Sequence, residues 1–175
     1  KYYSVGGENV PPFPMPAARA AYQAKKTGGH ICFIEGEFKG AALDKNGIET
    51  VAFGGIGLYK LDHTTRDYIT TRRPDVILVT YDGDFNDVRR DKKNGQITSQ
   101  RAKNFYNSAA KFTGQLVNYL ESIEHKAKIV WVAVNPDNPA KGADDLLAAA
   151  NNPAEVVHQL TALKETDNWT FTKLS

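Results

Sequence analysis

The sequence predicts an α/β fold, with a mostly parallel central sheet of about four strands and helices on both faces. Short runs of apolar and β-branched residues alternate with longer segments of helical composition along most of the 175 residues. The run from Asp75 to Thr80 is almost continuously apolar, which is typical of a strand buried on both faces. Alternating strands and helices build parallel sheets through right-handed crossover connections, so the order of the elements indicates this class.

The first 29 residues are expected to form an extended lead-in and a short helix. Four of the eight prolines lie between Val5 and Pro16, and proline both lacks an N–H and interrupts helices. The alanine-rich run from Ala17 to Lys26 then favours a helix, which the Gly28-Gly29 pair ends. Residues 30–175 are expected to fold as one compact α/β domain.

The rest of the chain alternates strands and helices. Strands are predicted where β-branched and aromatic residues cluster between turn residues, and helices where apolar residues recur every three or four positions. The expected strands are His30–Ile34, Thr50–Phe53, Asp75–Thr80, Lys128–Val134 and an edge strand at Trp169–Thr172. The expected helices are Glu37–Leu43, part of Tyr59–Arg72, Phe105–Ile123, Ala143–Ala150 and Ala154–Leu163.

Composition indicates an ordinary folded protein, with 41% hydrophobic and 24% charged residues. The formal net charge of +2 gives no strong basic field, so any contact with nucleic acid must be local.

The single cysteine, Cys32, lies in an apolar run and is expected to be a buried, reduced thiol, which favours the cytoplasm. No apolar stretch approaches the roughly 20 residues of a membrane helix, so no membrane partner is expected. Because the chain begins at Lys1, we expect it to be a fragment of a longer polypeptide.

Acidic side chains follow three of the predicted strands. Glu35 comes after the first, Asp82 and Asp84 after the third, and Asp144 and Asp145 after the fourth. Because the carboxyl ends of parallel strands meet at one edge of a sheet, we expect these groups to converge there. Carboxylates brought together repel one another, and a hard cation such as Mg²⁺ relieves the repulsion. An isolated Asp-Gly-Asp is more often a solvated turn, so the hypothesis depends on the ordered combination.

Two of these motifs resemble those of a known family. The segment from Ile31 to Lys39 (ICFIEGEFK) places glutamate and glycine after the first strand, and Val79 to Asp84 (VTYDGD) places Asp-x-Asp after the third. This order resembles the Toprim domain, which bacterial primases, type IA and type II topoisomerases and several nucleases share. The later Lys141 to Leu147 (KGADDLL) is similar to the closing acidic motif of primase-like members encoded with phage and plasmid replication helicases. The resemblance runs from about His30 to Ala150 and implies a Toprim, Rossmann-like fold.

The resemblance also implies roles for the acidic residues. Glu35 would be a catalytic general acid/base or a metal ligand. Asp82 and Asp84 would be the Mg²⁺-binding pair, with Asp144 and Asp145 as further ligands. In such a site the metal neutralises phosphate charge and stabilises the charge that develops in phosphoryl transfer.

Four basic residues near these motifs are expected to bind phosphates or the nucleic-acid backbone, namely Lys39, Arg89, Arg90 and Lys141. Lys39 is in addition a candidate for the catalytic machinery. Solvated surface charge is an equal alternative for the two arginines. Lys39 could instead pair with Glu35 across the helix start, which would be a structural role.

The function implied by the resemblance is that of a Mg²⁺-dependent, primase-like catalytic domain of a replication protein from a mobile element, with Mn²⁺ as a substitute metal. Its partners would be nucleic acid (DNA, including single strands), nucleotides, and a helicase or other replication module in the same chain. The polar stretch after Asp84 departs from many primases, and the zinc-binding cysteines of a primase N-terminal module are missing. Two alternatives stay open: a Toprim nuclease, and a non-catalytic module that binds nucleic acid or a partner.

Further candidates come from the aromatic residues and the glycines. Most aromatic residues are expected to lie in the core, and Tyr81 and Phe85, which bracket the acidic turn, are the two to test for contact with a nucleotide. The segment Gly54-Gly55-Ile56-Gly57 could cradle a phosphate through backbone amides. It lacks the lysine and hydroxyl residue of a phosphate-binding loop, so a plain turn is the better interpretation.

Overall fold

A six-stranded sheet of mixed direction forms the centre of the computed structural model, which describes residues 12–55, 59–83, 93–94 and 100–173. The strand order is β1-β3-β2-β4-β5-β6. The four central strands are parallel, whereas β1 pairs antiparallel with β3 and β6 pairs antiparallel with β5. The strands are β1 (Phe13–Pro14), β2 (His30–Glu35), β3 (Thr50–Phe53), β4 (Val76–Tyr81), β5 (Lys128–Val134) and β6 (Trp169–Lys173).

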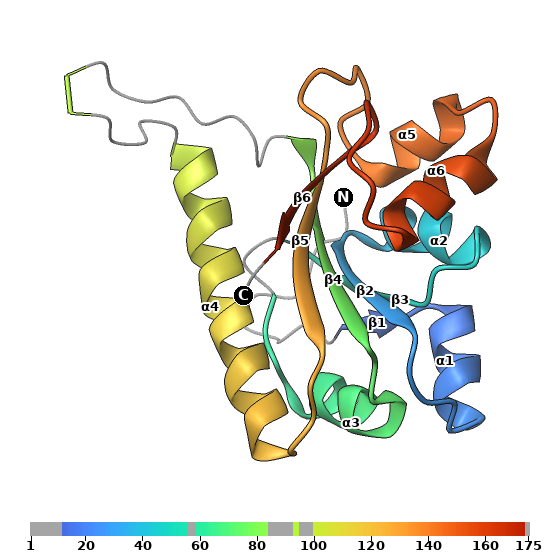
Figure 1. The fold of residues 1–175 in the computed structure, drawn as a ribbon, viewed down its shortest axis with the longest axis vertical. Helices are drawn as coiled ribbons and strands as arrows, with labels where there is room; N and C mark the ends of the chain where they lie inside the picture. Colours follow the sequence, from blue (N-terminus) through green and yellow to red (C-terminus); the bar gives the residue numbers. More distant parts are fainter. Residues whose placement is uncertain (1–11, 56–58, 84–92, 95–99, 174–175) are drawn as a thin grey trace, which may run out of the picture.

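Helices cover both faces of this sheet (Figure 1). Side chains of α3 and α4 share one hydrophobic core with the sheet, and side chains of α2, α5 and α6 share the other. The helices are α1 (Pro16–Gln23), α2 (Glu37–Lys45), α3 (His63–Arg72), α4 (Gln100–Ser122), α5 (Ala143–Ala149) and α6 (Pro153–Thr161). Over the described ranges, none of these helices is both long and apolar enough to cross a membrane.

The predicted α/β class is confirmed, but the sheet differs from the prediction. In the described residues it has six strands rather than about four, and the two edge strands run antiparallel to their neighbours. The edge strand predicted at Trp169–Thr172 forms β6. The other edge strand, β1, comes from the proline-rich lead-in, where the sequence predicts no strand. An edge strand tolerates Pro14 because the missing N–H can face away from the ladder.

The central strands are buried on both sides because their side chains alternate between the two cores. In β2, Ile31 and Phe33 lie in the core shared with α3 and α4, whereas Cys32 and Ile34 lie in the core shared with α2, α5 and α6. Each of these four side chains is at most 2% exposed. The nearly continuous apolar pattern in the sequence therefore reflects a sheet with two covered faces.

Local capping determines where two of the helices begin. The side chain of Asp62 accepts a hydrogen bond of 2.9 Å from the backbone N–H of Thr65 at the start of α3. Asn152 caps α6 in the same way, and Pro153 follows it in the first turn, where a missing N–H costs nothing. Both helices thus start at residues whose side chains replace absent backbone partners.

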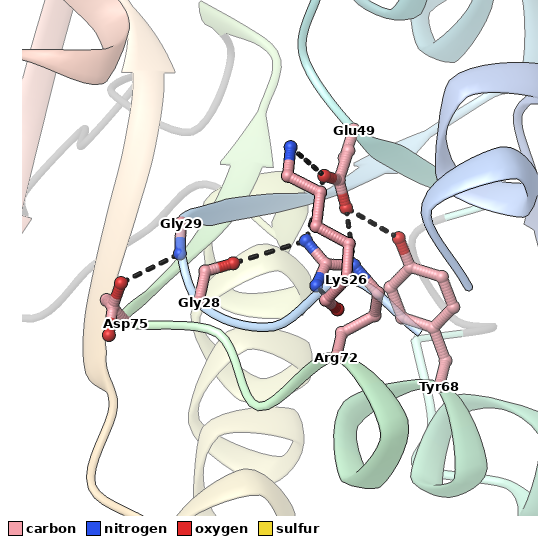
Figure 2. A network of polar contacts seen from close by, with 7 residues as sticks. All are labelled: Lys26, Gly28, Gly29, Glu49, Tyr68, Arg72 and Asp75. Carbon is pink, nitrogen blue, oxygen red and sulfur yellow. Dashed lines mark hydrogen bonds and ion pairs between the residues drawn. The ribbon is translucent and has the colours of Figure 1, made fainter. Parts of the chain in front are cut away.

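A buried arginine ties together the loops at the amino ends of β2 and β3 (Figure 2). Arg72 is 0% exposed and holds Glu49 through two hydrogen bonds, from Nε to Oε2 and from Nη2 to Oε1, each 2.8 Å long. It also donates to the carbonyl oxygens of Lys26 and Gly28, and Tyr68 donates to Glu49 at 3.2 Å. Burial lowers the pKa of the Arg72 guanidinium, but the hydrogen bonds and charge of Glu49, together with Tyr68, outweigh this effect and leave that pKa above its ordinary value. This network links α3 to the loop before β2 and to the start of β3.

Cys32 is buried, as predicted, and its sulfur lies 3.1 Å from Oγ1 of Thr80. Burial raises the pKa of its thiol to about 12, and the contact with Thr80 lowers that pKa by less than burial raises it.

At a pH near the ordinary thiol pKa of about 8.5, the buried thiol of the folded chain therefore holds far less of the reactive thiolate than the unfolded chain does. We expect the folded chain to react with a thiol reagent such as DTNB at least about 100-fold more slowly than the unfolded chain. Absorbance of the released thiolate measures both rates. Equal rates would show that Cys32 is accessible in the folded chain.

Candidate metal and phosphate site

The described helices that follow β2 and β4 lie on opposite faces of the sheet. β2 continues into α2 on one face, whereas the first described helix after β4 is α4, on the other face (Figure 1). The two strands are neighbours in the sheet. Open α/β sheets bind their ligands at such a reversal of connection. The two motifs that carry the predicted site residues follow these two strands.

Gly36 makes the turn that places Lys39 over this edge of the sheet. Its φ of +87° lies in a region that favours glycine, and its N–H donates to the carbonyl oxygen of Phe53 at 2.7 Å. Helix α2 begins at the next residue, so Lys39 falls in the first turn of the helix. A positive charge is disfavoured there by the helix dipole, so an anion is needed beside Lys39.

That anion is Asp82, the first residue after β4. The ammonium of Lys39 donates to both oxygens of its carboxylate, at 2.7 Å to Oδ1 and 2.6 Å to Oδ2. The two side chains are 21% and 20% exposed, so water shields the pair less than it shields an ion pair on the surface. The sequence offered Glu35 as the structural partner of Lys39, and the structure places Asp82 against it.

Asp144 reaches the same pair from the start of α5. A Cβ atom on Gly142 would lie 2.8 Å from Oδ1 of Asp144, 2.9 Å from Cε of Lys39 and 3.2 Å from Oδ1 of Asp82. The three side chains therefore surround a position that glycine leaves open. Oδ1 of Asp144 is buried and has no hydrogen-bond partner among the described residues, which is costly unless a donor or cation satisfies it. We call Lys39, Asp82, Gly142 and Asp144 the strand-end site.

The loop before α5 is attached to the end of β4. The N–H of Gly83 donates to the carbonyl oxygen of Lys141 at 2.8 Å, which brings the two segments together. Lys141 and Asp145 are both exposed, and a carboxylate oxygen of Asp145 lies 3.4 Å from the N–H of Lys141. Asp145 thus interacts with the backbone at the helix start, while the neighbouring Asp144 belongs to the strand-end site.

Glu35 lies at the carboxyl end of β2, toward the opposite face of the sheet. It shares its side of the strand with Phe33, which packs in the core that the sheet shares with α3 and α4, here called the α4-side core. Tyr59 of that core donates to the carbonyl oxygen of Thr80 at 2.8 Å. Burial raises the pKa of the Tyr59 hydroxyl well above its ordinary value, and the charge of Glu35 adds to this effect. Tyr59 therefore stays protonated near the Glu35 carboxylate.

The structure thus brings together only some of the residues predicted to converge. Asp82 and Asp144 each place an oxygen beside Gly142, Glu35 lies toward the other face, and Asp145 contacts the helix start. Within the described part of the chain, no group of three or more His, Cys, Asp or Glu side chains could hold a metal ion. Two carboxylates with an unsatisfied oxygen are nevertheless the kind of donor that Mg²⁺ prefers, and a third would have to come from elsewhere. Outside the described residues lie Asp84, Arg89, Arg90 and Phe85.

Two aromatic residues at this end of the sheet differ from expectation. Tyr81 is 2% exposed and stacks on Tyr59 with ring centroids 5.4 Å apart, so its ring is a core side chain and does not offer a face to a nucleotide. Phe38, in contrast, is 72% exposed in the first turn of α2, beside Lys39. Sequence reasoning also missed Gly142, whose position just before the Asp144-Asp145 pair was the available signal.

Comparison with known proteins finds no match for this chain. This holds for protein-family models, for curated proteins and for solved structures. The resemblance to the Toprim domain therefore depends on the motif residues alone.

Proposed function

We propose that this chain is a Mg²⁺-dependent catalytic domain that transfers nucleotidyl or phosphoryl groups on nucleic acid, as primase-like Toprim domains do. The observation that carries the proposal is that side-chain atoms of Asp82, Asp144 and Lys39 surround one point beside Gly142, at the carboxyl ends of β2 and β4. Carboxylates bind a hard cation, and an ammonium binds phosphate oxygens as a point charge. The strand-end site therefore suits a phosphate that is bound together with a metal.

Each residue has a separate part in this proposal. Asp82 and Asp144 hold the cation, joined by Asp84 from the same acidic motif. When bound, Mg²⁺ or its substitute Mn²⁺ neutralises phosphate charge and stabilises the charge that develops during transfer. Lys39 binds a phosphate oxygen. Glu35 is half-buried at the end of β2 and lies toward the other face of the sheet, so it would have to reach the attacking hydroxyl group across the sheet edge to accept its proton.

Exposed groups at the same end of the sheet suit a single nucleic-acid strand. Phe38 offers an exposed aromatic ring on which a base can stack, and the exposed Lys141 can pair with a backbone phosphate. The net charge of +2 favours such local contacts over attraction by a long-range field. DNA and nucleotides are thus the proposed ligands, and a helicase or other replication module in the same polypeptide is the proposed context, in the cytoplasm.

A nuclease is the second candidate, because the same groups would serve it if water replaced the hydroxyl group of a nucleotide as the nucleophile. A non-catalytic binding module is the third candidate. It does not explain why an oxygen of Asp144 is buried without a hydrogen-bond partner among the described residues.

The test is a calorimetric titration with Mg²⁺ and with Mn²⁺, each in the presence of a short oligonucleotide, of the unmodified chain and of an Asp82→Asn, Asp144→Asn double variant. We expect the unmodified chain to bind and the variant to lose at least about 100-fold in affinity, because losing even an outer-shell partner of a metal costs about 10- to 100-fold. Nucleotide-incorporation and strand-cleavage assays on the metal-loaded chain then distinguish the primase-like reaction from the nuclease.

The matched control is a Glu121→Gln, Glu124→Gln double variant, which removes the same charge. Both glutamates are exposed, Glu121 in the last turn of α4 and Glu124 just after it, at the opposite end of the sheet from the strand-end site (Figure 1). This control should bind like the unmodified chain. Equal binding by the Asp82, Asp144 variant, or no binding by the unmodified chain even with an oligonucleotide present, would contradict the metal site and favour the non-catalytic module.

A further inference from the structure

We infer that Lys39 sets the order in which the strand-end site binds its ligands: it occupies Asp82 until a phosphate group takes its ammonium, and Asp82 then becomes available to the cation. The inference rests on the proposed function, because it assumes that Asp82 is a metal ligand. It adds that a phosphate is the group that opens the metal site.

The geometry of the ion pair carries the first step. The ammonium of Lys39 engages both oxygens of Asp82, at 2.7 Å and 2.6 Å. A divalent cation that binds this carboxylate must displace the ammonium or lie close to its charge. Because both side chains are about one-fifth exposed, the repulsion between the two positive charges is only partly screened. A free cation is therefore expected to bind the substrate-free site weakly.

The position of Lys39 on α2 carries the second step. Lys39 stands in the first turn of a nine-residue helix, where backbone N–H groups favour an anion and disfavour the ammonium. A phosphate arriving there meets both the helix start and Lys39, so it is an alternative partner for the ammonium. A Cβ atom on Gly142 would lie 2.9 Å from Cε of Lys39, and glycine leaves that space open, so the flexible end of the Lys39 side chain can move while the helix stays in place.

The two steps make phosphate binding and cation binding cooperative. A phosphate that removes Lys39 from Asp82 raises the affinity for the cation, and by thermodynamic reciprocity the cation raises the affinity for the phosphate by the same factor. Under this arrangement the metal joins the site together with a substrate.

The test is a calorimetric titration with Mn²⁺ of the unmodified chain and of Lys39→Met, which removes the ammonium and keeps most of the stem. Each is titrated alone, with a short single-stranded oligonucleotide, and with a nucleoside monophosphate. We expect Lys39→Met alone to bind Mn²⁺ at least about 10-fold more tightly than the unmodified chain, within the usual range of coupling between sites. If the oligonucleotide raises the affinity of the unmodified chain for Mn²⁺, the site takes a phosphodiester, and if the nucleoside monophosphate does so, it takes a terminal phosphate. Either probe should raise the affinity of Lys39→Met for Mn²⁺ by a smaller factor.

The matched control is Lys45→Met, which removes the same charge from an exposed position in the last turn of α2 and should leave the affinity for Mn²⁺ unchanged. Equal affinity of Lys39→Met and the unmodified chain, or an equal gain from phosphate in both, would overturn the inference and leave the proposed function standing. No binding of Mn²⁺ by either protein, with or without the two probes, would overturn the proposed function and the inference with it.

Discussion

Replacing Glu49 by glutamine is expected to lower the free energy of unfolding by about 3–5 kcal/mol, because it leaves the charge of Arg72 buried without its counter-ion. Arg72 is 0% exposed and Glu49 only 10% exposed, so water cannot replace the lost carboxylate. The loss is large beside the total of about 5–15 kcal/mol that stabilises a typical domain. Equilibrium unfolding in urea, followed by circular dichroism, measures it.

Lys26→Met is the control for this prediction, since Lys26 forms an ion pair with the same carboxylate. The distance is 3.3 Å, but the Lys26 side chain is 64% exposed, so its loss should cost no more than about 1 kcal/mol. A similarly small loss for Glu49→Gln would show that the carbonyl oxygens of Lys26 and Gly28 are sufficient to hold the guanidinium of Arg72.

Replacing Phe112 by alanine is expected to lower the free energy of unfolding by about 3–5 kcal/mol, because it leaves a cavity in the α4-side core. Phe112 is 0% exposed, and its ring packs edge-on against Phe33, Phe53 and Tyr59, with centroids 5.4, 5.6 and 5.6 Å away. Each edge-to-face contact adds about 0.5–1.5 kcal/mol to the loss of buried area. The same unfolding experiment measures the effect.

Val117→Ala serves as the comparison on the same helix, because Val117 is 40% exposed and its truncation should change the stability by no more than about 0.5 kcal/mol. If Phe112→Ala were as mild, the surrounding rings would have to move into the space that it vacates. Tyr59, which donates a hydrogen bond to the carbonyl oxygen of Thr80 near the end of β4, would move with them.

The positions of most strands follow from local sequence. β3 and β5 run over the predicted residues Thr50–Phe53 and Lys128–Val134, because clusters of β-branched and aromatic residues between turn residues specify a strand wherever the sheet forms. β1 does not follow in this way. Its two residues, Phe13 and Pro14, carry no strand pattern, and only the open edge of β3 provides the partner that makes them a strand.

The sequence by itself determined that acidic residues follow the parallel strands and therefore gather near one edge of the sheet. Tertiary structure decided which of them meet. Asp144 and Asp145 are adjacent, but successive residues of a helix point about 100° apart, so Asp144 lies beside Gly142, as Asp82 does, while Asp145 interacts with the backbone of Lys141. Lys39 and Asp82 lie 43 positions apart and meet because β2 and β4 are neighbours. Periodicity specifies local elements, whereas the partner of a charged side chain depends on how those elements pack.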